Sequence, residues 1–267
     1  MSKELLSTNQ DSFGLWCLHA QLERLRGRLD EARKVYQTIL ISSHPDNSQP
    51  YISRMWWNWV EMEWLAGGET QSLNVVLKSV RLEGSSSGVT ILRGKRILDD
   101  LIDSTDPTNW KDLESWVRMR ALLELLTGSP SSAIAVVDKY LSGAKCGSFH
   151  ESLTTFALLM LYYHGVTLRN SMPPSILRER AHAAFEVYPS NSIILGLLLE
   201  SEKGQGVWGR LRKTLGGNDS KAKDVTRRIE EVWIAAWEKG RWVGELERTR
   251  NGLSAAVEHE RFVIFAN

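Results

Sequence analysis

Apolar residues recur at three- and four-residue steps between Leu15 and Leu40, and this spacing predicts two amphipathic helices. The first apolar stripe, with Trp16 beside it, consists of Leu15, Leu18, Leu22 and Leu25. Gly27 lies between the two helices, where a residue without a Cβ allows a sharp turn. Each helix alone has too little apolar surface to offset its loss of conformational entropy, so we expect the pair to stack on further helices.

The spacing of this helix pair recurs along the chain. Measured from Trp16, a glutamate follows after seven residues, a glycine after eleven, an alanine after sixteen and a tyrosine after twenty. The copy from Trp56 keeps the first two offsets, and the copy from Trp116 has both one residue late. Ile193 replaces the tryptophan of a later copy, and a last copy is degenerate. The expected structural signature is Trp16, Glu23, Gly27, Ala32, Tyr36, Trp56, Glu63, Gly67, Trp116, Glu200, Gly204 and Trp233.

The rest of the chain also predicts helices. One additional helix is expected at residues 89–103, and the weaker segments 153–164 and 180–185 are expected to form another pair. Linkers rich in Gly, Pro, Ser and Asn separate the pairs, and strand alternation is absent over any useful length. The sequence therefore predicts an all-α fold: an α-solenoid of consecutive antiparallel helix pairs. We expect a flexible lead at residues 1–11 and a single solenoid domain at 12–267.

The frame Trp…Leu-Glu…Gly…Ala-Arg…Tyr resembles the half-a-TPR (HAT) repeat of RNA-processing proteins. The segments LWCLHAQLERLRGRLDEARKVYQTIL and MWWNWVEMEWLAG match its pattern well. The tetratricopeptide repeat (TPR) is the nearest alternative, but it favours small residues at its helix crossing and lacks the Trp-to-Glu frame. The resemblance covers most of residues 15–259, and it implies a HAT/TPR-like superhelix.

Among HAT proteins, the chain is most similar to the C-terminal repeat region of the NRDE-2 (nuclear RNAi defective) family. The segments RMWWNWVEMEWLAG and NGLSAAVEHER carry this similarity. It implies a nuclear protein of RNA surveillance, splicing and RNA interference, whose partners include splicing factors and an exosome-associated RNA helicase. In that family the helicase contacts an N-terminal portion, so we expect this chain to be a fragment that carries the repeat scaffold. HAT proteins often dimerise, so a homodimer is a further expectation, although the sequence does not locate its interface.

The composition argues against binding of nucleic acid or membranes through overall charge, and against a membrane-spanning segment. The 33 Lys and Arg residues nearly cancel the 32 Asp and Glu residues, so no overall field attracts nucleic acid or a membrane surface. The two cysteines lie far apart, which fits a reducing compartment. The longest apolar run, residues 156–163, is too short to span a membrane.

Two segments resemble enzyme motifs but lack the surrounding sequence that those motifs require. Residues 84–88 fit the G-x-S-x-G nucleophile elbow, but no strand precedes them. Gly88, Gly94 and Lys95 imitate a phosphate loop with the wrong gap. The six histidines are scattered, and none has metal-ligand spacing. We therefore expect no catalytic residue, cofactor or metal.

Three tryptophans crowd the helix that begins near Trp56. Trp57, Trp59 and Trp64 point to three faces of one helix, so at least one is expected to be partly exposed or covered by a neighbouring repeat. An exposed tryptophan is a candidate anchor for a protein partner. The recurring Trp16, Trp56 and Trp116 are instead expected to pack between paired helices.

A basic region spans residues 203–228. Its Arg210, Arg212 and Lys213 are candidate partner-binding residues, either for RNA or for an acidic peptide, and a solvated loop is the alternative interpretation. The recurring glutamates belong to different repeats, so we expect hydrogen bonds or ion pairs with an arginine such as Arg33 rather than catalysis.

These observations favour a non-catalytic protein-protein interaction scaffold of nuclear RNA processing, which binds a helical or extended segment of its partner. The alternatives are direct RNA binding through residues 203–228 and a scaffold of another RNA-processing complex, in splicing or 3′-end processing.

Overall fold

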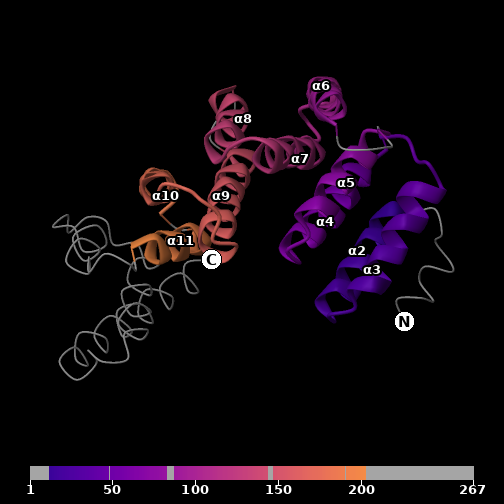
Figure 1. The fold of residues 1–267 in the computed structure, drawn as a ribbon, viewed down its shortest axis with the longest axis horizontal. Helices are drawn as coiled ribbons and strands as arrows, with labels where there is room; N and C mark the ends of the chain where they lie inside the picture. Colours follow the sequence, from indigo (N-terminus) through magenta and orange to yellow (C-terminus); the bar gives the residue numbers. More distant parts are fainter. Residues whose placement is uncertain (1–11, 48, 83–86, 144–146, 190, 203–267) are drawn as a thin grey trace, which may run out of the picture. The chain divides into compact units, whose positions relative to one another are not determined.

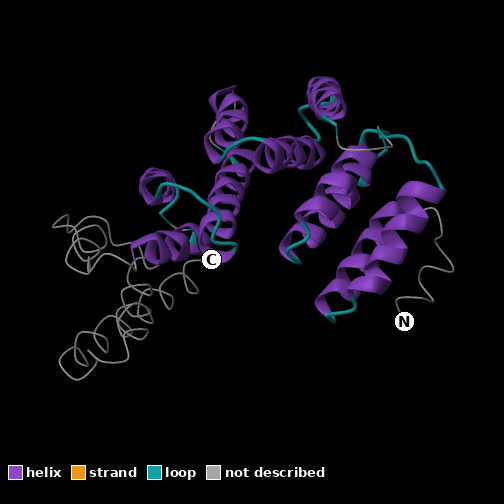
Figure 2. Ribbon diagram, viewed as in Figure 1, coloured by secondary structure: helices purple, strands orange, loops and turns teal. Residues whose placement is uncertain are grey.

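The computed structural model describes residues 12–47, 49–82, 87–143, 147–189 and 191–202, and in these ranges every regular element is a helix (Figures 1 and 2). The α-helices are α2 (Phe13–Leu25), α3 (Leu29–Tyr36), α4 (Ile52–Leu65), α5 (Glu69–Ser79), α6 (Gly88–Ser104), α7 (Trp110–Thr127), α8 (Pro130–Gly143), α9 (Ser148–Tyr162), α10 (Pro174–Val187) and α11 (Ser192–Glu202). Short π-helical segments follow α3 at Gln37–Ser42 and α9 at Tyr163–Thr167. The predicted all-α class is confirmed for the described residues.

The chain divides into two compact units, residues 1–160 and 161–267, and each is described by itself. In the first unit, α2 packs on α3, α4 on α5 and α7 on α8, as the repeat predicted. The predicted additional helix is α6, which packs on α7. Because Gly94 and Lys95 lie inside α6, the phosphate-loop-like motif forms no loop there.

Successive helix pairs of the first unit contact one another. Both α2 and α3 pack on α4, and both α4 and α5 pack on α7. The first helix of each later pair therefore lies against the pair that precedes it, and α4 has helices on several sides.

The turns at Gly27 and Gly67 have the same geometry, as their equal places in the repeat predict. Gly27 has a φ of +76° and Gly67 a φ of +81°, a left-handed conformation that favours glycine. The residue after each glycine donates its N–H to the carbonyl of the repeat glutamate: Arg28 to Glu23 at 2.9 Å, and Gly68 to Glu63 at 3.0 Å. This pair of Schellman motifs ends α2 and α4 at equivalent residues.

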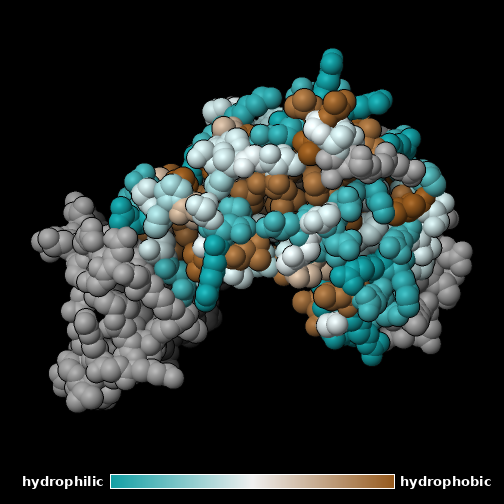
Figure 3. All heavy atoms as spheres, viewed as in Figure 1, coloured by the Kyte–Doolittle hydropathy of each residue, from teal (hydrophilic) through white to brown (hydrophobic). Residues whose placement is uncertain are grey.

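The apolar stripe of α2 is oriented differently from what its periodicity suggests. Leu18 is 60% exposed and Leu25 is 87% exposed, whereas Cys17, Ala20 and Glu23 are buried. The small side chains of Cys17 and Ala20 allow close packing of the neighbouring helices. Leu18, Leu22 and Leu25 of the stripe are therefore exposed, whereas Leu15 is half-buried. Apolar residues also gather over α6 in Figure 3, where residues 89 and 92 are among the exposed hydrophobic side chains.

In the second unit, α10 packs on α11. Pro174 occupies the first turn of α10, where its missing N–H has no helical partner to lose. Ala181 and Phe185 of α10 and Ile194 and Leu198 of α11 are buried. None of the helices in the described ranges has the length and hydrophobicity that a membrane span requires.

The two glycine turns give the first prediction. Gly27→Ala and Gly67→Ala should each lower the free energy of unfolding by about 1 kcal/mol, because a Cβ is strained at positive φ. No atom lies within 4 Å of either added Cβ, so the effect is conformational. Gly88→Ala, which is also unobstructed but has no positive φ, is the matched control in urea denaturation. Equal stability of the Gly67 and Gly88 variants would contradict this account.

Candidate functional site

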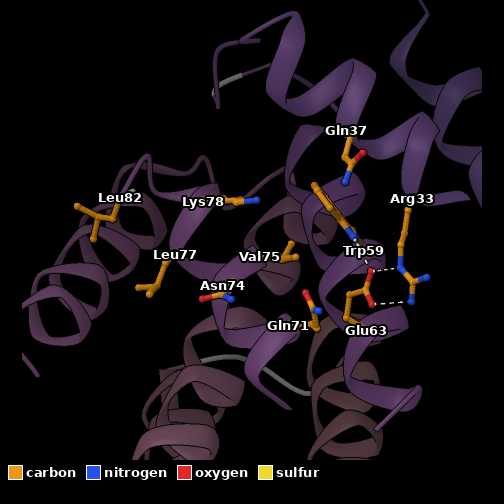
Figure 4. Close-up of a pocket in the computed structure, with 10 residues that line it drawn as sticks. All are labelled: Arg33, Gln37, Trp59, Glu63, Gln71, Asn74, Val75, Leu77, Lys78 and Leu82. Atoms are coloured by element: carbon orange, nitrogen blue, oxygen red, sulfur yellow. Dashed lines mark hydrogen bonds and ion pairs between the residues drawn. The ribbon is translucent and has the colours of Figure 1, made fainter. Parts of the chain in front are cut away.

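Glu63 joins the first helix pair to the second. Its carboxylate accepts hydrogen bonds from Arg33 Nε at 2.7 Å and Arg33 Nη2 at 2.9 Å, and from Trp59 Nε1 at 3.0 Å (Figure 4). Glu63 is 4% exposed and lies on α4, whereas Arg33 lies on α3 of the preceding pair. Such a bidentate pair is stronger and more directional than a single hydrogen bond. The bond to Glu63 also raises the pKa of the Arg33 guanidinium. The predicted pairing of a repeat glutamate with Arg33 is confirmed.

Glu124 is held by a comparable pair. Its Oε2 lies 2.8 Å from Lys95 Nζ and 2.7 Å from Arg120 Nη1. Lys95 comes from α6, so here too a cation of a preceding helix reaches the glutamate of the next. Burial raises the pKa of Glu124, but the hydrogen bonds from Lys95 and Arg120 outweigh it and leave that pKa below its usual value. Glu23 instead lies 2.8 Å from Arg26 of its own turn.

The tryptophan-rich helix α4 is enclosed. Trp57, Trp59 and Trp64 are each 3–4% exposed, so the second of the two expected outcomes holds: neighbouring helices cover all three, and none is an exposed anchor. The physical reason is that α4 packs on α2, α3, α5 and α7, and a helix that is hydrophobic all round needs such a position. Trp59 stacks between Tyr36 and Trp56, with ring centroids 6.0 and 5.9 Å away.

The tryptophans that head the first three repeats mostly pack as predicted. Trp56 and Trp116 are buried, at 4% and 2% exposure. Trp16 is half-buried and meets the ring of His19 edge to face. These residues hold helices together and offer little surface to a ligand.

A groove of about 730 Å³ runs across the first helices of the first three repeats in the first unit. Its lining comes mainly from α2, α4 and α7, with Ser152 of α9. The side chains and glycine that line it are Ser12, Gly14, Leu15, Cys17, Leu18, Gln21, Tyr51, Arg54, Trp57, Asn58, Trp110, Lys111, Glu114, Ser115, Arg118 and Ser152.

Two positions of the repeat line this groove in all three copies. Two residues before the leading tryptophan lie Gly14, Arg54 and Glu114. Two residues after it lie Leu18, Asn58 and Arg118. These positions are four residues apart, so they occupy one face of each first helix. The side chains at these two positions differ between the copies, whereas the residues of the framework recur.

The two arginines of the groove are tied to neighbouring helices. Arg54 Nε donates to Asp112 Oδ1 at 3.1 Å, and Ser53 Oγ donates to the same oxygen at 2.7 Å. Arg118 Nη2 donates to Glu114 at 2.5 Å and to Ser152 at 3.1 Å. These contacts join α4 to α7 and α7 to α9, and they place both guanidinium groups at the groove.

A rigid aromatic base supports Arg118. The Arg118 guanidinium carbon lies 5.7 Å from the ring centroid of Trp57 and 5.2 Å from that of Phe156. These two rings meet edge to face, 5.3 Å apart. Trp57 therefore contributes to the groove as a support for the arginine.

A second hollow, of about 650 Å³, lies beside the Glu63 pair and is shown in Figure 4. Its lining includes Arg33, Gln71, Asn74 and Lys78. The guanidinium of Arg33 already bonds to Glu63 and, through Nη1 at 2.7 Å, to Asp30. We therefore regard this hollow as part of the framework.

Other sequence candidates are not brought into the groove. Arg210, Arg212 and Lys213 lie outside the described residues, as do Gly204 and Trp233. Glu200 lies on α11 of the second unit. Among the described residues, no group of three His, Cys, Asp or Glu side chains is placed to hold a metal ion.

The sequence interpretation missed Arg54 and Arg118. Neither belongs to the recurring framework, because the residues at their places in the other copies differ. The signal that could have found them is their distance of two residues from a leading tryptophan, on opposite sides of it.

Comparisons with protein-family models and with curated proteins found no match to this chain.

The Glu63 pair gives a prediction on stability. Glu63→Gln should lower the free energy of unfolding by about 2 kcal/mol, because a charge-assisted bidentate contact is lost while Arg33 can still be hydrated. Glu31→Gln removes a carboxylate that pairs with Lys34 at 2.8 Å on the surface. That control should change stability by less than about 0.5 kcal/mol. Urea denaturation of both variants checks the difference, and equal effects would contradict a structural role for Glu63.

Glu124 gives a prediction on pH. Its folded pKa lies below the usual value of 4.5, so its stabilising effect is complete above that pH and is lost as the pH falls through the folded pKa. Glu124→Gln should therefore be less stable than the wild type at neutral pH, and this difference should shrink in acid. Urea midpoints at about pH 7 and about pH 3.5 check it. A difference that stays constant would show that the charge of Glu124 does not stabilise the fold.

Proposed function

We propose that the chain is a HAT-type α-solenoid that acts as a non-catalytic protein-protein interaction scaffold in nuclear RNA processing. The observation that carries the proposal is the groove, because its lining comes from the same two repeat positions in three successive helix pairs. A partner's helical or extended segment would lie across the first helices and contact one copy after another.

The contacts between helix pairs support a solenoid. In the first unit each pair packs on the next, and a cation from a preceding helix reaches Glu63 and Glu124. Repeat proteins build their continuous core from such nearest-neighbour contacts. Side chains held by these contacts can be displayed to a partner with little rearrangement on binding.

The resemblance to HAT repeats, and to the NRDE-2 family in particular, supports the biological setting. On that basis the partners are proteins of splicing and RNA surveillance in the nucleus. The exosome-associated RNA helicase would be reached through regions outside this chain. The groove supports a protein partner, and no feature of the described residues specifically favours RNA.

Copurification from nuclei tests this function. The tagged chain should recover splicing or RNA-surveillance proteins, and ribonuclease treatment should not release them. Leu18→Asp should remove them, because Leu18 is 60% exposed and lines the groove. Leu25→Asp is the matched control, because Leu25 is 87% exposed on the same helix and is not among the groove residues.

Three results would contradict the proposal. Recovery of no RNA-processing protein by the wild type would remove the nuclear RNA-processing assignment. Equal recovery by the wild type and by Leu18→Asp would remove the groove as the binding surface. Release of every partner by ribonuclease would favour an RNA-mediated role instead.

A further inference from the structure

We infer that the groove binds a protein segment in which acidic side chains lie beside an apolar one. This inference rests on the proposed scaffold function and specifies the chemistry of the partner. The groove is lined by three cations, Arg54, Lys111 and Arg118, and by one carboxylate, Glu114. The charge that would complement this lining is negative.

Arg54 has hydrogen-bond donors to spare. Its Nε bonds to Asp112, but neither terminal nitrogen makes a hydrogen bond within the described part of the chain. The guanidinium lies 4.6 Å from the ring centroid of Tyr51, which limits its movement. A planar guanidinium held in this way presents its terminal N–H groups as a pair that fits a carboxylate.

Arg118 adds a second set of donors. Its Nη2 is occupied by Glu114 and Ser152, but its Nε is buried and has no hydrogen-bond partner among the described residues. Its Nη1 likewise makes no hydrogen bond there. Because Nε is enclosed, the donor that remains for an incoming carboxylate or carbonyl oxygen at the groove is Nη1.

The part of the groove formed by α2 is apolar. Leu15 and Leu18 line it, and Leu18 exposes most of its side chain. The position two residues after the leading tryptophan therefore changes from one copy to the next: it is Leu18 in the first copy, Asn58 in the second and Arg118 in the third. A segment with an apolar residue at one end and acidic residues further along matches this order.

The same groove is poorly suited to RNA. The ring of Trp57 is 4% exposed, so it offers no face for a base to stack on. The cations of Arg54 and Lys111 lie over the rings of Tyr51 and Trp110. Asp112 and Glu114 already neutralise part of the charge of the two arginines. Binding of a phosphate chain grows with the number of phosphates that are neutralised, so it needs a long row of cations, whereas one carboxylate needs only the unbonded N–H groups of a single guanidinium.

Fluorescence anisotropy with the full chain tests the inference. The probe is a short labelled peptide with leucine at one end and glutamate and aspartate along the rest of its length. The comparison probes are the same peptide with glutamine and asparagine as the polar residues, and an oligouridylate of similar length. The acidic peptide should bind about tenfold more tightly than its amide counterpart and should weaken as salt is added.

Variants locate the site. Arg54→Gln and Lys111→Gln should each weaken binding of the acidic peptide, the former by about tenfold. Lys78→Gln is the matched control, because Lys78 is an exposed cation of the other hollow, and it should bind like the wild type. The urea midpoint of each variant checks its fold, and Lys111, which is exposed on the surface of α7, can be replaced without disturbing a buried pair.

Each contrary outcome overturns the inference. These outcomes are equal binding of the acidic and amide peptides, tighter binding of the oligouridylate, and unchanged binding by both groove variants. The proposed function fails separately. If Arg54→Gln recovers the same nuclear proteins as the wild type, the proposed scaffold function is retained and the inference of an acidic partner segment is rejected. If the acidic peptide binds but no RNA-processing protein copurifies, the inference that the groove binds acidic segments is retained and the assignment to nuclear RNA processing is rejected.

Discussion

The buried carboxylate of Glu63 is the constraint on which the packing of the first two helix pairs depends. A carboxylate at 4% exposure is costly unless charged or polar donors surround it, and Arg33 and Trp59 supply them. Because Arg33 belongs to the preceding helix pair, this requirement fixes how the two pairs are placed along each other. A shift of one helix turn would remove the guanidinium and leave the carboxylate buried without it. The ion pair therefore specifies a register, whatever its net contribution to stability.

Fixing the register has a consequence for the surface. When successive first helices are held at a constant offset, the same repeat positions of each helix come to line one groove. In the first unit those positions are two residues before and two residues after the leading tryptophan. The framework residues recur because every copy needs the same packing, whereas the residues at the two groove positions differ between the three copies.

Much of the fold could be predicted from the sequence. The helix pairs follow from apolar periodicity, the turns at Gly27 and Gly67 from the need for positive φ, and the pairing of Glu63 from its recurrence near arginines. What could not be predicted was which side of a helix is covered. Periodicity places Leu18 and Leu25 on a common stripe of α2, but the neighbouring helices pack elsewhere. In α4, by contrast, helices on several sides bury every tryptophan. Such outcomes depend on contacts between distant segments, which local spacing does not report.

A double-mutant cycle on Arg33 and Glu63 tests whether this ion pair couples the first two helix pairs. The free energy of unfolding would be measured for the wild type, Arg33→Gln, Glu63→Gln and the double variant. We expect a coupling energy of about 1–3 kcal/mol between the two residues, because they stabilise the fold through each other across two helix pairs. Additive effects, to within about 0.3–0.5 kcal/mol, would contradict it. In that case the ion pair would not be the interaction that sets the register of the helix pairs.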